Sequence, residues 1–348
     1  MERNILAPKG WIRQLTRRLR GDRPPRFVFV VHNRNHARIM VPVAAQLAHR
    51  AIACEFVDVE AETWDNGATS EIARYGWIST PLAQLARPLR PSDVLVLAVD
   101  WWPAQLLALI EECRKNGMRV IGLNEGCRFA QPFRYRQVDK MLAWGPSSLA
   151  AFDRPVEIVG APMIESCLRA SPTFESPPYA VINYKFTFDM QKGRESWIRD
   201  AIAACKAAAL SFRISRHPND RDDFLDLPLE PRGIEELMLG ASALISRPST
   251  TIYQALAAGV PVVHFPAENE ELVEFADPFG AFESASVADE LPELLRRAIA
   301  GRATVRERSR LFLERHVSID PARPATQRIV DALLAEYAAG SGAPMILA

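Results

Sequence analysis

The segment of residues 243–265, ALISRPSTTIYQALAAGVPVVHF, constrains the fold of this chain more than any other stretch. Residues 243–245 and 260–265 are apolar runs that include β-branched side chains, which is typical of buried strands. The polar stretch 247–251 breaks this pattern, and apolar residues then recur at the spacing of a helix. The segment therefore predicts a strand, a tight loop, a short helix and a second strand, which is one unit of a parallel α/β sheet.

Hydroxyl side chains stand where this helix is expected to begin. Ser249, Thr250 and Thr251 follow one another, and Thr251 with Gln254 fits a capping box. Free backbone N–H groups, hydroxyl groups and the positive end of a helix together suit a phosphate group. The segment is thus either a phosphate-binding helix terminus or an ordinary capped helix.

The same alternation runs along most of the chain. Strand-like runs occur at residues 26–31, 53–57, 93–99, 118–123, 140–143, 156–159, 179–183, 211–215, 243–245 and 260–265, with a short one near Phe282. Helix-like stretches occur at residues 37–50, 104–116, 194–208, 252–259, 287–300, 303–315 and 323–338. Strands that alternate with helices predict parallel sheets covered on both faces.

The length of 348 residues suits two domains, and a Ser- and Pro-rich stretch separates two α/β patterns. The fold class is therefore α/β, with two Rossmann-like doubly wound domains that face a central cleft. The predicted divisions are a basic N-terminal segment (1–23), a first domain (24–168), a linker (169–178), a second domain (179–322) and a C-terminal helix (323–348). The C-terminal helix could pack back on the first domain.

The composition excludes several classes of protein. Lys+Arg and Asp+Glu both number 42, so the formal net charge is zero and nothing favours a nucleic-acid partner. The five cysteines show no zinc or redox spacing, which predicts reduced thiols of a cytoplasmic protein. No apolar run approaches the length of a membrane span, and the N-terminus lacks the apolar core of a signal peptide.

The N-terminal segment is nevertheless basic and amphipathic. Basic residues interleave with Trp11, Ile12, Leu15 and Leu19 over residues 9–20. A helix would gather these apolar side chains on one side, which suits a peripheral position on an anionic membrane surface. The alternative is a solvated tail.

Two strand exits in the predicted sheets carry candidate catalytic residues. The strand 211–215 is followed closely by His217-Pro218, and Pro218 restricts the backbone there. His217 could therefore bind a phosphate group from the side opposite the 249–251 loop. The alternative is that His217 is an ordinary loop residue. The strand 118–123 ends in Asn124-Glu125-Gly126, and Glu125 could accept a proton from a hydroxyl group unless it pairs with Arg128.

The exit of the first strand is also polar. His32, Asn33, Arg34 and His36 could hold an acceptor or stabilise developing charge, or could cap the next helix. At a further exit, Trp101-Trp102 could be a platform for a sugar or part of the core. No Gly-rich dinucleotide fingerprint, Walker loop or G-x-S-x-G elbow occurs. The acidic run of residues 220–223 resembles a metal-binding run only superficially and is interpreted as a solvated loop. With no D-x-D pair at a strand end and no His/Cys cluster, the sequence predicts no metal site and no other cofactor.

These motifs together resemble GT-B glycosyltransferases. G-A-P-M-I-E closes the first half, A-L-A-A-G-V-P-V-V lies in the second, and the layout extends over residues 26–337. Within that fold, three motifs look like those of bacterial CMP-sialic acid-dependent sialyltransferases and related capsule enzymes: Asn124-Glu125-Gly126, with Asn in place of the first acid, His217-Pro218 and Ser249-Thr250. CDP-glycerol-dependent teichoic-acid polymerases look similar in the second half, although their His-Gly has no clear match.

The resemblance implies a metal-independent, inverting glycosyltransferase that uses a nucleotide sugar to build a bacterial surface glycan at the cytoplasmic face of the membrane. Glu125 would be the base, while His217, Pro218 and residues 249–251 would bind the nucleotide phosphate. Glu268 and Glu270 follow G-V-P-V-V where related enzymes read the sugar, or they begin a solvated helix. A UDP-sugar 2-epimerase of the same fold, a CDP-glycerol-type polyol-phosphate transferase and an inactive sugar-binding protein are the alternatives.

Overall fold

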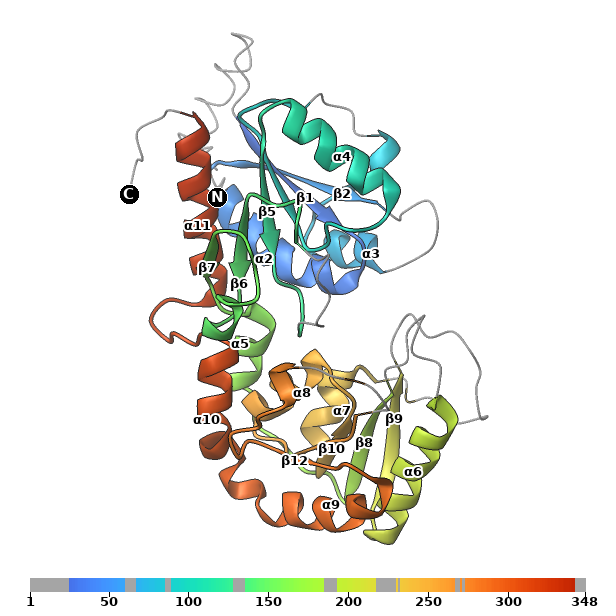
Figure 1. The fold of residues 1–348 in the computed structure, drawn as a ribbon. Coiled ribbons are helices and arrows are strands. Elements are labelled where there is room, and N and C mark those ends of the chain that lie inside the picture. Colours follow the sequence, from blue (N-terminus) through green and yellow to red (C-terminus); the bar gives the residue numbers. More distant parts are fainter. Residues whose placement is uncertain are drawn as a thin grey trace, which may run out of the picture.

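The computed structural model describes residues 25–59, 67–84, 89–127, 135–184, 193–216, 230, 232–266, 270 and 273–341. The strands in this part of the chain form two sheets, one of seven strands and one of five, in which all pairs are parallel. Helices flank both sheets (Figure 1). The predicted pair of doubly wound α/β units is confirmed.

The first sheet has the order β3-β2-β1-β4-β5-β6-β7. Its strands are β1 (Arg26–Val31), β2 (Ala53–Asp58), β3 (Ser79–Pro81), β4 (Val94–Leu97), β5 (Arg119–Leu123), β6 (Lys140–Ala143) and β7 (Val156–Ile158). Its helices are α2 (Arg34–His49), α3 (Ala68–Ala73), α4 (Ala104–Lys115) and α5 (Pro162–Leu168). Strand β1 pairs with both β2 and β4, so the strand order reverses there.

The second sheet has the order β12-β11-β10-β8-β9. Its strands are β8 (Tyr179–Tyr184), β9 (Ser211–Arg216), β10 (Ala243–Ser246), β11 (Val262–His264) and β12 (Glu283–Ser284). Its helices are α6 (Arg194–Ala207), α7 (Ile234–Gly240), α8 (Thr250–Ala258), α9 (Leu291–Ala300) and α10 (Val305–His316). Short 3-10 helices lie at Leu82–Gln84, Pro146–Ser148, Val273–Phe275, Ala288–Glu290 and Arg302–Thr304.

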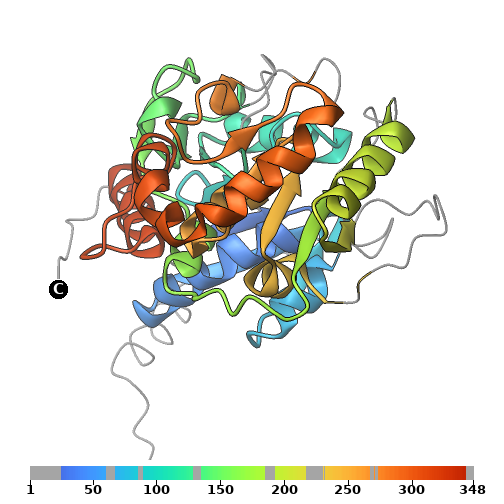
Figure 2. The same cartoon turned by 90° about the horizontal axis from the view of Figure 1, so that it is seen from below.

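Strand β1 shows why both faces of each sheet are covered. All six of its residues are buried, and successive side chains point to opposite faces. Phe27 and Phe29 pack in one cluster with residues of α2, whereas Val28 and Val30 pack in another with residues of α4. The second sheet is similar, and Figure 2 shows α6 and α9 (yellow-green and orange) covering one of its faces, where their apolar residues share a core.

The last helix, α11 (Ala325–Ser341), returns to the first sheet (Figure 1). Its Ile329 and Val330 belong to the cluster around Phe27, whose ring stacks on Tyr337 with centroids 5.6 Å apart. The chain thus crosses between the two sheets twice, once after α5 and once after α10.

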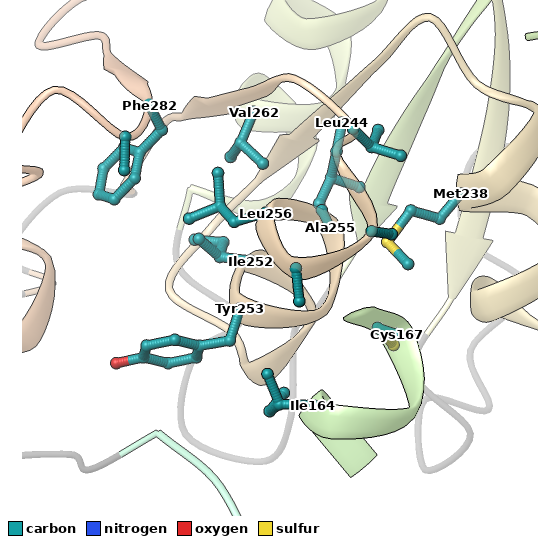
Figure 3. Close-up of a cluster of buried hydrophobic side chains, with 14 of the residues drawn as sticks. Ile164, Cys167, Met238, Leu244, Ile252, Tyr253, Ala255, Leu256, Val262 and Phe282 are labelled. Carbon is teal, nitrogen blue, oxygen red and sulfur yellow. The ribbon is translucent and has the colours of Figure 1, made fainter. Parts of the chain in front are cut away.

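Helix α8 joins the two halves through apolar packing. Ile252, Tyr253 and Leu256 share one buried cluster with Ile164 and Cys167 of α5 (Figure 3). Trp144, which follows β6, meets the Tyr253 ring edge-on at 6.0 Å. Because α8 belongs to the second sheet and α5 to the first, this cluster fixes the helix that begins at residues 249–250 against the first half.

The structure also contains elements that the sequence pattern did not predict. Helices α3, α5 and α7 have six or seven residues and β3 has three, which is too short for a hydrophobic period to be recognised. Helix α2 begins at Arg34 rather than at residue 37, so Arg34 and His36 lie in its first turn instead of in a loop. Its N-cap is Asn33, whose side chain accepts hydrogen bonds from the backbone N–H groups of Asn35 and His36.

Candidate functional site

The candidate site lies where the carboxyl ends of both sheets reverse their strand order. In the first sheet this point is flanked by the exits of β1 and β4, which are followed by His32 and Trp102. In the second sheet it is flanked by β8 and β10, and β10 leads into Arg247 and the cap of α8. Ligands of doubly wound sheets bind in the crevice at such points.

Glu125 pairs with His36 across 89 positions of the chain. The Glu125 carboxylate contacts His36 Nε2 at short range, and the His36 side chain is fully buried whereas that of Glu125 is 26% exposed. The backbone N–H of His32 donates to His36 Nδ1 at 3.3 Å. Since Nδ1 accepts this bond, Nε2 carries a ring proton and donates it to Glu125. His36 therefore orients a carboxylate that is partly open to solvent.

His32 lies beside this pair but is enclosed. Its side chain is buried, and neither ring nitrogen has a hydrogen-bond partner in the described part of the chain. The pKa of His32 is lowered from 6.5 to about 3, mainly by burial and in part by the neighbouring His36, while Glu125 opposes the change. His32 is consequently neutral at pH 7, and its nitrogens are shielded from solvent.

The N-terminus of α8 touches the Glu125 loop. Thr250 Oγ1 accepts a hydrogen bond of 3.1 Å from the backbone N–H of Cys127. Gly126 permits this approach, because a Cβ atom at that position would lie only 2.9 Å from Thr250 Oγ1. The hydroxyl proton of Thr250 is not used in this bond. The helix terminus predicted to bind phosphate and the loop that carries Glu125 are therefore neighbours, although 123 positions separate Cys127 from Thr250.

The predicted capping box is wrong in detail. Ser249, not Thr251, is the N-cap of α8, and its side chain accepts from the Thr251 N–H at 3.3 Å. Thr251 lies inside the first turn, and Gln254 donates to Glu235 of α7 instead. Helix α8 therefore begins at Thr250, two residues before the position that a Thr251 cap would give. Ser249 has the extended backbone that is typical of a cap residue.

Arg247 is a charged residue of the site that the sequence analysis missed. It directly follows β10, its side chain is 2% exposed, and its guanidinium forms bonds of 2.8 and 2.6 Å with the two carboxylate oxygens of Glu270. Burial lowers the pKa of Arg247, and Glu270 opposes this change. Glu270 is therefore next to the α8 cap, not part of a solvated helix. An arginine directly after a buried strand was the available signal.

Other polar residues of the first half lie near the second half. Arg34 pairs with Glu71 of α3 at 2.9 Å instead of joining the His36–Glu125 pair. Arg38 of α2 bridges the halves through Glu235 at 3.3 Å, and Glu235 also accepts from Gln254. This chain of contacts and the Cys127–Thr250 bond are two polar links between the halves.

Several predicted residues lie outside the part of the chain that the structure describes. These are His217, Pro218, Arg128, Glu268 and the N-terminal residues 1–24. Their predicted roles in phosphate binding, in pairing with Glu125, in sugar recognition and at a membrane surface remain predictions.

The described residues form neither a metal cluster nor a membrane-spanning helix. No three His, Cys, Asp or Glu side chains in these ranges gather closely enough to hold a metal ion. Among the same residues, no helix is both long and apolar enough to cross a membrane.

Solved structures similar to this chain include glycosyltransferases and epimerases. The chain is similar to the spinosyn rhamnosyltransferase SpnG, solved with spinosyn aglycone, at a TM-score of 0.57 and 14% identity over 88% of this chain and 99% of SpnG. It is similar to the spinosyn forosaminyltransferase SpnP at a TM-score of 0.51 and 16% identity, covering 90% and 99% of the two chains.

The second kind is an epimerase. The UDP-GlcNAc 2-epimerase of Methanocaldococcus jannaschii, solved with UDP-GlcNAc and UDP, gives a TM-score of 0.60 and 12% identity over 88% of this chain and 99% of the epimerase. No family model matches the sequence, and no curated protein matches it. At these identities the likeness establishes the fold, which is the GT-B fold that the sequence motifs predicted.

Proposed function

We propose that this GT-B protein is a glycosyltransferase that moves a sugar from a nucleotide sugar to a hydroxyl group of a glycan acceptor, with inversion at the anomeric carbon. One observation carries the proposal: Thr250 at the α8 N-terminus contacts the loop of Glu125. A phosphate at α8 and a hydroxyl group at Glu125 would meet at one place, and holding two reactants together is a large part of catalysis.

The chemistry follows from the two partners of that contact. Glu125 takes the proton of the acceptor hydroxyl as its oxygen attacks the anomeric carbon, and the bond from that carbon to the phosphate oxygen breaks. The nucleotide leaves with the electron pair, and the positive N-terminal end of α8 stabilises its charge. His36 positions Glu125 through its Nε2–H. The base role falls on Glu125 and not on His32, because His32 is enclosed by protein.

The phosphate site predicts a loss of nucleotide affinity. Removing the hydroxyl groups in the double variant Ser249→Ala/Thr250→Val should weaken binding by about 1–3 kcal/mol, the usual value for hydrogen bonds to a charged group. His217→Ala is expected to act in the same direction. Calorimetry with the nucleotide that binds best would measure the change, and Thr250→Ser, which keeps the hydroxyl, is the matched control. Unchanged affinity in the double variant would make α8 an ordinary capped helix.

The donor nucleotide is the first property to determine. A thermal-shift screen of CMP, CDP, UDP and GDP identifies it, because a ligand of the native state raises the unfolding temperature. Stabilisation by CMP would support the resemblance to CMP-sialic acid-dependent sialyltransferases. Stabilisation by CDP would support the polyol-phosphate transferase alternative. Binding of a nucleotide without turnover of any matching donor would favour an inactive sugar-binding protein.

A UDP-sugar 2-epimerase is the second candidate function. The structural similarity to an epimerase that was solved with UDP-GlcNAc and UDP favours it, at a TM-score of 0.60. An epimerase needs one nucleotide sugar and no acceptor. Incubation of the full chain with UDP-GlcNAc alone, followed by NMR of the sugar, separates the two functions, since a new UDP-sugar epimer would reject the transferase proposal.

The proposed acceptor is a bacterial surface glycan or its lipid-linked form at the cytoplasmic face of the membrane. Residues 9–20 would hold the enzyme there through their basic and apolar side chains. Sedimentation with vesicles that contain anionic lipid, compared with neutral vesicles, tests this position. A chain that lacks residues 1–23 should lose the difference.

We expect catalysis without a divalent metal ion. The leaving phosphate has the α8 N-terminus as its proposed partner, where the positive end of the helix takes the place of a metal ion. Transfer activity should therefore be the same in EDTA as in buffer. Activity that disappears in EDTA and returns with Mn²⁺ or Mg²⁺ would contradict the expectation and point to acidic residues outside the described ranges.

A further inference from the structure

The adjacent residues Trp101 and Trp102 differ in their exposure to solvent, which the sequence alone could not predict. Trp101 is partly buried and meets the Tyr135 ring edge-on, with centroids 5.6 Å apart. Trp102 is 54% exposed. Tryptophan side chains are on average well buried, so an indole that is more than half exposed is unusual.

The position of Trp102 is at the point where ligands of such a sheet bind. It follows β4, whose neighbours in the sheet are β1 on one side and β5 on the other. These two strands lead into His32 and Glu125. Neighbouring strands lie about 5 Å apart, so the Trp102 segment leaves the sheet between the exits that carry the two residues.

The segment that carries Trp102 is held firmly. The buried carboxylate of Asp100 accepts hydrogen bonds from the backbone N–H groups of Tyr135 and Gln137 at 2.6 and 2.7 Å. Tyr135 also donates its hydroxyl to the carbonyl of Ala98 at 2.8 Å. The His32 ring lies against Trp102, with centroids 6.0 Å apart and planes at 32°. The His32 ring therefore packs against the Trp102 indole, while much of the indole surface stays exposed to solvent.

We propose that Trp102 is the platform on which a pyranose ring of the acceptor stacks. The π-face of an indole carries partial negative charge and suits the polarised C–H groups of a sugar ring. A ring stacked there would present the hydroxyl groups at its edge toward the exit of β5, where the Glu125 carboxylate lies. The inference rests on the proposed function in one respect, which is that the stacked sugar is the acceptor. It makes the acceptor a saccharide rather than a simple alcohol.

Binding to Trp102 can be tested without a donor or turnover. The full chain is labelled with 5-fluorotryptophan, and its seven tryptophans are followed by fluorine NMR, with Trp102→Phe assigning one resonance. The probes are the methyl pyranosides of glucose, galactose, mannose and N-acetylglucosamine, and separately CMP and UDP. At least one pyranoside should shift the Trp102 resonance saturably and leave that of Trp77, which packs on Phe56, unchanged.

Two results would overturn the inference. One is that no pyranoside shifts the Trp102 resonance. The other is that only a nucleotide shifts it, in which case the indole stacks on a base. If a nucleotide binds through Ser249 and Thr250 but pyranosides leave Trp102 unchanged, this inference fails alone. If UDP-GlcNAc is epimerised without an acceptor, the proposed function fails whatever Trp102 does.

Kinetics with an identified donor and acceptor give a second test. Trp102→Ala should raise the acceptor KM about 10-fold or more through lost aromatic contact area, while Trp102→Phe retains much of the affinity. The KM of the donor should change little. Tyr75→Ala is the matched control, because Tyr75 is 56% exposed but follows α3, away from the exits of β4 and β5. An acceptor KM that is unchanged in Trp102→Ala would contradict the proposal.

Discussion

Replacing Glu125 by glutamine is expected to lower turnover about 10²–10⁴-fold, which is the usual contribution of a positioned base. Glutamine keeps an oxygen that can accept the His36 Nε2–H, so the geometry of the pair is preserved while the carboxylate is lost. The affinity for the nucleotide should stay nearly constant. Single-turnover kinetics together with calorimetry would measure the two quantities separately.

Two further variants define the roles around Glu125. His36→Asn removes the partner of the carboxylate and should lower turnover less than Glu125→Gln, because His36 acts only by orienting the base. His32→Gln should leave a functional base in place. If Glu125→Gln retains near-full turnover and His32→Gln does not, the base is His32. If Glu125→Gln unfolds or loses nucleotide binding, Glu125 has a structural role.

Acidification is expected to destabilise the fold through two enclosed histidines. Burial lowers the pKa of His264 from 6.5 to about 4, and that of His32 to about 3. Between these pKa values and 6.5, the two histidines bind protons in the unfolded chain but not in the native state. The free energy of unfolding is therefore unaffected by them above pH 6.5 and decreases as the pH falls below 6.5. At about 1.4 kcal/mol per pKa unit, each histidine should lower the free energy of unfolding by about 3 kcal/mol at pH 4.

His264 offers a direct test of this acid sensitivity. Its ring lies against Phe275 and Phe282, Nδ1 bonds the Ser284 hydroxyl at 3.1 Å, and Nε2 has no hydrogen-bond partner among the described residues. His264→Phe fits these neighbours and cannot be protonated. Urea unfolding from pH 7 to 4 should show a shallower loss of stability in this variant than in the parent. Parallel pH profiles would show that His264 does not cause the acid sensitivity.

Local patterns were sufficient for the main elements of the fold. The runs at residues 26–31, 140–143 and 211–215 appear as β1, β6 and β9 within one residue, because a strand buried on both faces is apolar along its whole length. The loop before α8 was placed from its hydroxyl residues, while phosphate binding there stays a prediction. The short elements α3, β3, α5 and α7 were missed, since each is shorter than the window in which a period can be counted.

The sequence by itself thus determined the fold class, the alternation of elements and the strand exits that carry polar residues, because these depend on side chains close together in the chain. Only the tertiary structure decided which exits meet. His36 and Glu125 are 89 positions apart, Cys127 and Thr250 are 123 apart, and the pairing of Arg247 with Glu270 depends on the packing after β10. The physical reason is that the order of strands in the sheet, and not their order in the chain, sets which carboxyl ends are neighbours. The packing of distant elements likewise determines that His32 is buried and that Trp102 is exposed.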